Sequence, residues 1–97
     1  MPLKKQSVDI QKIEKEWRSR GFQGGLWMDP PGQLWKDYIH NVDELVMVID
    51  GEVEIEMEGS TYLLQIGEEI LIPANTYHTV RNSGKEKSRW LYAYKLK

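Results

Sequence analysis

The two histidines of this chain lie far apart in the sequence, and their side chains are the ones best suited to chemistry. His40 stands in the middle of WKDYIHNVDE (residues 35–44), and His78 stands in PANTYHTVRN (residues 73–82). An imidazole, with an unperturbed pKa of about 6.5, serves as a proton donor or acceptor and as a metal ligand. The histidines are therefore either two isolated side chains or two halves of one site that folding brings together.

Composition narrows the kind of protein that could carry such a site. The chain has 97 residues, a formal net charge of −2 with interspersed signs, and no cysteine. This length suits one domain, and the missing cysteines exclude disulfides, thiolate metal sites and a cysteine nucleophile. The charge pattern predicts no nucleic-acid partner, and the polar N-terminus predicts neither a signal peptide nor a membrane segment. We therefore expect a cytoplasmic protein.

One segment has the period of a helix. In SVDIQKIEKEWRSRG (residues 7–21), Ile10, Ile13 and Trp17 recur at i, i+3 and i+7 between charged residues. Ser7 or Asp9 is a suitable N-cap, and Gly21 is a suitable stop. The sequence thus predicts a short helix near the N-terminus.

Strands and turns follow from residue 22 onward. DPPG (residues 29–32) predicts a turn, and the apolar run ELVMVI (residues 44–49) leads into Asp50-Gly51, a strong hairpin signal. In the next segment we expect Val53, Ile55 and Met57 to face inward and Glu52, Glu54, Glu56 and Glu58 to face water. Further strands are expected within residues 61–66, 68–73 and 89–96. This spacing is typical of an antiparallel sandwich or barrel.

Two glycine-bounded segments resemble the paired motifs of the cupin superfamily. The first motif is usually written G-x5-H-x-H-x3-4-E-x6-G, and its positions fall here on Gly32, Tyr38, His40, Glu44 and Gly51. The second is G-x5-P-x-G-x2-H-x3-N, and its positions fall on Gly67, Pro73, Asn75, His78 and Asn82. The resemblance covers about half of the chain without a gap.

This resemblance implies the fold and the site. The fold would be an all-β antiparallel jelly-roll barrel with a short N-terminal helix, in one domain over residues 1–97. The helix and lead-in would occupy residues 1–24 and the barrel residues 25–97. The resemblance also places both histidines, with Glu44, on ligand positions for a divalent metal, which could be iron, zinc, manganese, nickel or copper.

Tyr38 is the main departure from the family pattern, because it stands where the family usually has another histidine. A phenol, with an unperturbed pKa of about 10, is mostly protonated at neutral pH and is a poor ligand. The remaining two-histidine, one-carboxylate set is typical of open non-heme iron sites. Tyr38 is the candidate catalytic residue. It would donate a hydrogen bond to a bound ligand, act as an acid or base near the metal, or only pack against Trp35 or Trp90.

Alternation along strands makes a geometric prediction for the site. The side chains expected inside are Tyr38, His40, Val42 and Glu44 on one strand, and His78, Val80 and Asn82 on another. An inward carboxylate costs free energy unless it is paired, hydrogen-bonded or bound to a cation. Asp37 and Asp43 alternate with these inward residues and should point to the other face of the strand, so we expect them outside the ligand set. Asn82 should hold a turn by side-chain hydrogen bonds, and Arg81 should point outward.

The final strand adds an aromatic face made of Trp90, Tyr92 and Tyr94, which would line the barrel mouth or a subunit contact.

The leading hypothesis is a metal-dependent cupin acting on a small organic substrate, with dioxygenase-type chemistry favoured and isomerase chemistry open. The alternative is a non-catalytic ligand-binding or sensing cupin with a degenerate metal site. A third hypothesis is a dimerising scaffold with a vestigial site. A homodimer is expected from the aromatic face and from the habit of small cupins.

Overall fold

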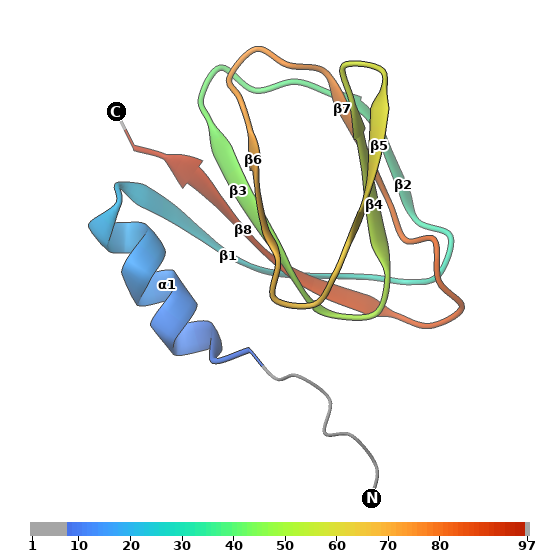
Figure 1. The fold of residues 1–97 in the computed structure, drawn as a ribbon, viewed down its shortest axis with the longest axis horizontal. Helices are drawn as coiled ribbons and strands as arrows, with labels where there is room; N and C mark the ends of the chain where they lie inside the picture. Colours follow the sequence, from blue (N-terminus) through green and yellow to red (C-terminus); the bar gives the residue numbers. More distant parts are fainter. Residues whose placement is uncertain (1–7, 97) are drawn as a thin grey trace, which may run out of the picture.

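The computed structural model describes residues 8–96, which form one helix and eight strands (Figure 1). The elements are α1 (Ile10–Ser19), β1 (Phe22–Asp29), β2 (Leu34–Tyr38), β3 (Glu44–Asp50), β4 (Val53–Met57), β5 (Ser60–Leu64), β6 (Glu69–Ile72), β7 (His78–Arg81) and β8 (Ser88–Lys95). Ser7, one of the two expected helix caps, lies outside the described residues. Across residues 8–96, no helix has the length and apolar character that crossing a membrane requires.

The strands form two four-stranded antiparallel sheets that face each other. The first sheet has the order β1-β8-β3-β6 and the second the order β2-β7-β4-β5. Figure 1 shows the two sheets as opposed layers, with α1 on the outer side of the first. The expected all-β fold with a short helix is confirmed. Within residues 8–96, no strand of one sheet pairs with a strand of the other, so the sheets do not join into one closed barrel.

Strand β3 is buried on both of its faces, which explains its unbroken apolar sequence. Val46 and Val48 point into the core between the two sheets. Leu45, Met47 and Ile49 point the other way, into a second core under α1. Because residues alternate across a strand, this element can fill two cores at once. Glu44 begins the strand on the side of Val46, and so faces the space between the sheets.

Helix α1 closes the outer face of the first sheet. Asp9 is its N-cap, as expected, and the carboxylate accepts a hydrogen bond from the Lys12 backbone nitrogen at 3.2 Å. Trp17 packs into the second core, and its indole nitrogen donates to Glu69 of β6 at 2.9 Å. Arg20 donates two further hydrogen bonds to the same carboxylate, each at 2.9 Å. Glu69 therefore ties the end of the helix to the sheet.

Strand β4 alternates as the sequence predicts. Val53, Ile55 and Met57 are buried, whereas Glu54 and Glu56 lie on the opposite face. Arg81 of β7 points outward as expected, and its guanidinium lies 3.1 Å from the Glu54 carboxylate. The second sheet thus has an ionic outer face and an apolar inner face.

Candidate metal centre

The segment that carries His40 is not the continuous strand that alternation predicts. β2 ends at Tyr38, residues 39–43 form a loop, and Glu44 begins β3 in the other sheet. The expected single face from Tyr38 to Glu44 is therefore wrong as local geometry. Val42, predicted to face inward with them, does not line the pocket that holds His40 and Glu44. The chain crosses from one sheet to the other here, and the loop sets the direction of His40.

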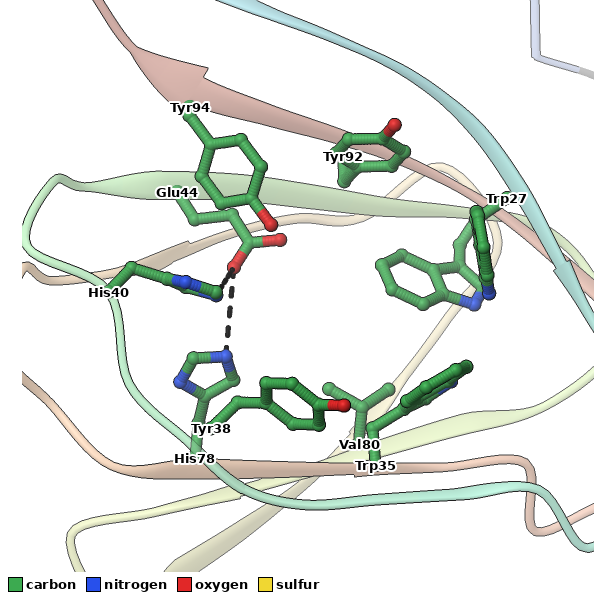
Figure 2. A pocket seen from close by; sticks show the side chains of 10 residues that line it. Trp27, Trp35, Tyr38, His40, Glu44, His78, Val80, Tyr92 and Tyr94 are labelled. Atoms are coloured by element: carbon green, nitrogen blue, oxygen red, sulfur yellow. Dashed lines mark ion pairs between the residues drawn. The ribbon is translucent and has the colours of Figure 1, made fainter.

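Folding nevertheless brings the three predicted ligands together. His78 begins β7 in the second sheet, and faces Glu44 across the space between the sheets. Oε1 of Glu44 lies 3.3 Å from Nε2 of His40 and 3.7 Å from Nε2 of His78 (Figure 2). The three possible ligand atoms all lie within 4.8 Å of one another. The two histidines are thus halves of one cluster.

Glu44 is the most constrained member of this cluster. Its side chain is only 5% exposed, and burial raises its pKa to about 7. Although Oε1 is close to both imidazoles, no hydrogen bond of acceptable geometry reaches this buried oxygen within the described residues. A buried carboxylate oxygen without a partner is costly unless a proton or a cation joins it. Glu44 is therefore poised to take up one or the other.

The orientation of His78 is set by the backbone. Its Nδ1 lies 3.1 Å from the carbonyl oxygen of Thr76, which can only accept, so Nδ1 carries the hydrogen. In the neutral ring this leaves the lone pair of Nε2 directed toward Glu44. The same pattern, with one ring nitrogen donating to a carbonyl, orients many metal-binding histidines. His40 is more exposed, and burial followed by the nearby His78 lowers its pKa, which favours its neutral form.

The loop that carries His40 and the loop that precedes His78 are tied together. The backbone nitrogen of Asn75 donates to the carbonyl oxygen of His40 at 2.6 Å. Asp43, expected outside the ligand set, accepts from the backbone nitrogen of Ala74 at 2.8 Å. Asn75 has a φ of 62°, the left-handed conformation that asparagine tolerates where the family motif has glycine. These bonds fix the separation of the imidazoles.

The three side chains form one end of a pocket with a volume of about 320 Å³. The lining residues are Trp27, Trp35, Tyr38, His40, Glu44, His78, Val80, Trp90, Tyr92 and Tyr94. Figure 2 shows the histidines and Glu44 at one end and the indoles of Trp27 and Trp35 at the other. No lysine or arginine is among the lining residues, so the pocket has an ionisable end and an aromatic end.

Tyr38 lines the pocket from a β-bulge. The pairing of β2 with β7 is irregular between Trp35 and Tyr38, and Asp37 between them has a φ of 56°. Both aromatic side chains consequently face the pocket, although strict alternation would separate them. The Tyr38 ring meets Trp35 edge to face at 5.9 Å, as expected for a packing role, and its hydroxyl in Figure 2 lies toward the indole end.

Tyr94 is nearer to the ligand cluster than the sequence analysis anticipated. Its ring centroid is 4.9 Å from that of His40, and Figure 2 shows its hydroxyl beside the Glu44 carboxylate. Burial, followed by the charges of Glu44 and Tyr92, raises its pKa to about 12. Tyr94 therefore keeps its proton and can only donate toward an anionic partner. In the sequence, the alternation of Trp90, Tyr92 and Tyr94 indicated that the three side chains share one face of a strand. It did not indicate whether that face lines a pocket or a subunit contact.

Asp29 is the residue that the sequence analysis missed altogether. It was assigned to the DPPG turn, but it is the last residue of β1, and its side chain is buried beside the pocket's indoles. Alternation from Trp27 would have placed both side chains on one face. The turn itself is held by Asn82, as expected, whose side-chain nitrogen donates to the carbonyl oxygens of Pro30 at 3.1 Å and Glu86 at 2.8 Å.

Comparison with known proteins agrees with this fold. The sequence model of the family described as "Cupin domain" matches residues 25–94. Since this match covers most of the chain, the chain belongs to the cupin family.

Individual relatives are more distant. "Polyketide synthase CurC" of Streptomyces cyaneus is 31% identical over 72 residues, which make up 74% of this chain and 47% of that protein. The Cupin_2 domain of an XRE family transcriptional regulator from Enterobacter cloacae has a TM-score of 0.72 and 22% identity, covering 82% of this chain and 86% of that one. A Cupin 2 conserved barrel domain protein from Salinispora arenicola has a TM-score of 0.69 and 18% identity, covering 97% and 69%. The chain spans about half the length of the curated relatives it matches.

Proposed function

We propose that this chain is a metal-dependent cupin in which His40, Glu44 and His78 hold a divalent ion beside a pocket for a small organic substrate. The observation that carries the proposal is the buried Oε1 of Glu44, which has two imidazole nitrogens within 3.7 Å and no hydrogen-bond partner. A cation between these atoms would satisfy all three at once. Two imidazoles and one carboxylate suit iron, zinc, manganese, nickel or copper.

A bound ion of this type supplies Lewis acidity toward a substrate or a centre for oxygen chemistry. The residues of this chain would do the rest. Tyr94, which retains its proton, would donate a hydrogen bond to a substrate oxygen near Glu44. The aromatic walls would exclude water from the substrate body, and Tyr38, 43% exposed, would stand at the accessible side of the pocket.

We favour a catalytic role of the oxygenase type. The two-histidine, one-carboxylate composition is the one found in non-heme iron oxygenases. The relative named as a polyketide synthase supports a substrate with keto or hydroxyl groups, which chelate divalent metals. Because that similarity covers about half of the relative, the reaction itself is part of the proposal.

A non-catalytic ligand-binding role is the second candidate, and Tyr38 favours it. The family usually has a histidine at this position, and the Tyr38 hydroxyl lies toward the indole end in Figure 2. The site therefore has one imidazole fewer than the usual set. A cupin domain of similar fold belongs to a transcriptional regulator, so this fold also occurs outside enzymes. A homodimer and a cytoplasmic location remain predictions.

Metal binding is the direct test. Purified protein should be stripped with a chelator and titrated calorimetrically with Mn²⁺, Ni²⁺ and Zn²⁺, and with Fe²⁺ under anaerobic conditions. The wild type should take up one ion per chain. Glu44→Gln should lose more than the ten- to hundred-fold that removing an outer-shell partner costs. Glu52→Gln is the matched control, because Glu52 is exposed on the surface, and it should bind like the wild type.

Three outcomes separate the candidates. If the wild type binds none of these ions, the metal proposal is wrong. Uptake by Glu44→Gln equal to the wild type would refute the ligand set. Metal uptake without turnover of any keto or hydroxy acid, under air or under nitrogen, would favour the ligand-binding role.

A further inference from the structure

One buried carboxylate organises the aromatic end of the pocket. Asp29 is 2% exposed and accepts hydrogen bonds from three indole nitrogens. The distances are 2.8 Å from Trp27, 3.0 and 3.1 Å from Trp35, and 3.1 Å from Trp90. These tryptophans come from β1, β2 and β8, so the carboxylate joins the two sheets.

Asp29 has no charged partner to account for its burial. Among the described residues it forms no salt bridge, and both of its side-chain oxygens accept from indoles. A well-packed apolar residue generally stabilises a core at least as well as a buried charged group. The hydrogen bonds from three indoles to one carboxylate instead restrict how the three rings can be oriented, because each N–H must point at the same side chain. Asp29 therefore acts on the orientation of the three rings.

The consequence is the shape of the pocket. All three indoles line it, and their N–H edges are turned toward Asp29. Neighbouring rings stand at steep angles: 68° between Trp27 and Trp35, and 67° between Trp90 and Tyr92. A wall of this kind offers ring faces and ring edges side by side, which suits another flat ring in stacked and edge-to-face contacts.

We propose that Asp29 is a positioning residue for specificity, holding the three tryptophans so that the pocket selects a flat, conjugated ring. The chelating oxygens of the same ligand would lie at the His40 and Glu44 end, and this part rests on the proposed metal site. No lysine or arginine lines the pocket, so the ring itself carries no negative charge. The volume of about 320 Å³ equals the liquid volume of roughly ten waters at ~30 Å³ each, which corresponds to a single-ring ligand.

The test compares two chelators that carry a hydroxyl and a carboxylate on neighbouring ring carbons, one on a flat ring and one on a puckered ring. Salicylate has a planar ring, and cis-2-hydroxycyclohexanecarboxylate has the same hydroxyl and carboxylate on a puckered ring. Binding to the Zn²⁺-loaded full chain is measured by calorimetry and by tryptophan fluorescence. The wild type should prefer salicylate by about ten-fold or more, because one or two good aromatic contacts supply about ten-fold and the more acidic phenol adds to it. Asn has only one accepting side-chain atom, so Asp29→Asn should reduce this preference by about three-fold or more relative to the wild type, at unchanged metal affinity.

Two further variants guard against a general loss of structure. Trp27→Phe keeps a ring in the partly exposed position but removes one donor to Asp29, and should lower the preference partially. Asp50→Asn changes an aspartate that pairs with Arg89 outside the pocket, and should leave the preference unchanged. An unchanged preference in both Asp29→Asn and Trp27→Phe, or none in the wild type, would overturn the proposal.

The metal proposal and the Asp29 proposal fail in different ways. Indole has a flat ring and no chelating group, so its binding to the metal-free protein, measured by calorimetry, reports the aromatic end without any metal. If the protein takes up no metal but binds indole more weakly in Asp29→Asn, only the metal site is refuted. If metal uptake is normal and both ring shapes and indole bind equally to wild type and variant, only the role of Asp29 is refuted.

Discussion

Glu44 and His78 face each other across the space between two sheets, with Oε1 and Nε2 3.7 Å apart. The hydrogen bond from His78 Nδ1 to Thr76 leaves Nε2 as an acceptor in the neutral ring, and Glu44 Oε1 is also an acceptor. Two acceptors that face each other in a buried place repel unless a proton or a cation lies between them. The competition between proton and metal at Glu44 is the basis of the first two predictions.

The metal-free protein should lose stability as Glu44 ionises. Burial raises its pKa to about 7 from the ordinary value of 4.5, so the buried neutral acid contributes stability below the lower value. That contribution is lost as the pH rises through about 7 and amounts to about 3 kcal/mol. In urea unfolding of chelator-treated protein, the free energy of unfolding of Glu44→Gln should therefore rise relative to that of the wild type between about pH 5 and 7.5. The lowered pKa of His40 acts in the opposite direction, and the comparison cancels it because both proteins carry His40. A pH-independent difference would contradict the prediction.

Metal affinity should rise with pH over the same range. A metal must displace the proton from Glu44, and both imidazoles must be neutral to coordinate. From pH 6 to 7.5 the ionised fraction of a group with a pKa of about 7 rises roughly eight-fold, so the affinity should rise at least that much. Calorimetry in two buffers of different ionisation enthalpy should also detect proton release on binding at pH 6. A flat affinity would show that these residues are not the ligands.

Tyr38→His should tighten metal binding. Tyr38 and His78 are direct partners in the β2–β7 ladder, and such partners have Cβ atoms about 5 Å apart on one face. A third imidazole here would complete the usual family set, and we expect an affinity gain of about ten-fold or more. Tyr38→Phe, which removes only the hydroxyl, should bind metal like the wild type. Equal affinities of the two variants would mean that the bulge before Tyr38 directs this side chain away from the ion.

Trp17→Ala should destabilise the fold without altering the metal site. The indole is buried between α1 and the first sheet, and truncating such a side chain costs about 3–5 kcal/mol. Trp17→Phe keeps most of the buried ring but loses the hydrogen bond to Glu69, which should cost about 1 kcal/mol. Thermal unfolding measures both, and metal uptake per folded chain should stay constant. Reduced uptake in the folded Trp17→Phe variant would show that the helix helps to set the metal geometry.

Local sequence patterns predicted local structure well. The i, i+3, i+7 spacing of Ile10, Ile13 and Trp17 marked α1, and the alternation of Val53 to Met57 marked the two faces of β4. These predictions succeeded because a helix or strand imposes its own period on the residues that it buries. The motif spacing also identified His40, Glu44 and His78 as a group, before any distance between them was known.

Alternation failed where the chain leaves one sheet for the other. It predicted one strand face from Tyr38 to Glu44, whereas the bulge at Asp37 and the loop over residues 39–43 interrupt the period. A period describes residues within a strand and says nothing about a crossing between sheets. The bulge also brought Trp35 and Tyr38 to the same side, although strict alternation would separate them.

The sequence by itself determined the helix, most of the strands, the family and the identity of the three candidate ligands. Only the tertiary structure decided that Glu44 Oε1 is left without a hydrogen bond, that Tyr94 covers the cluster, and that Asp29 gathers three tryptophans. The reason is physical: the burial of a carboxylate and its contacts across two sheets depend on register, bulges and loop length together. No residue spacing within one segment contains that information.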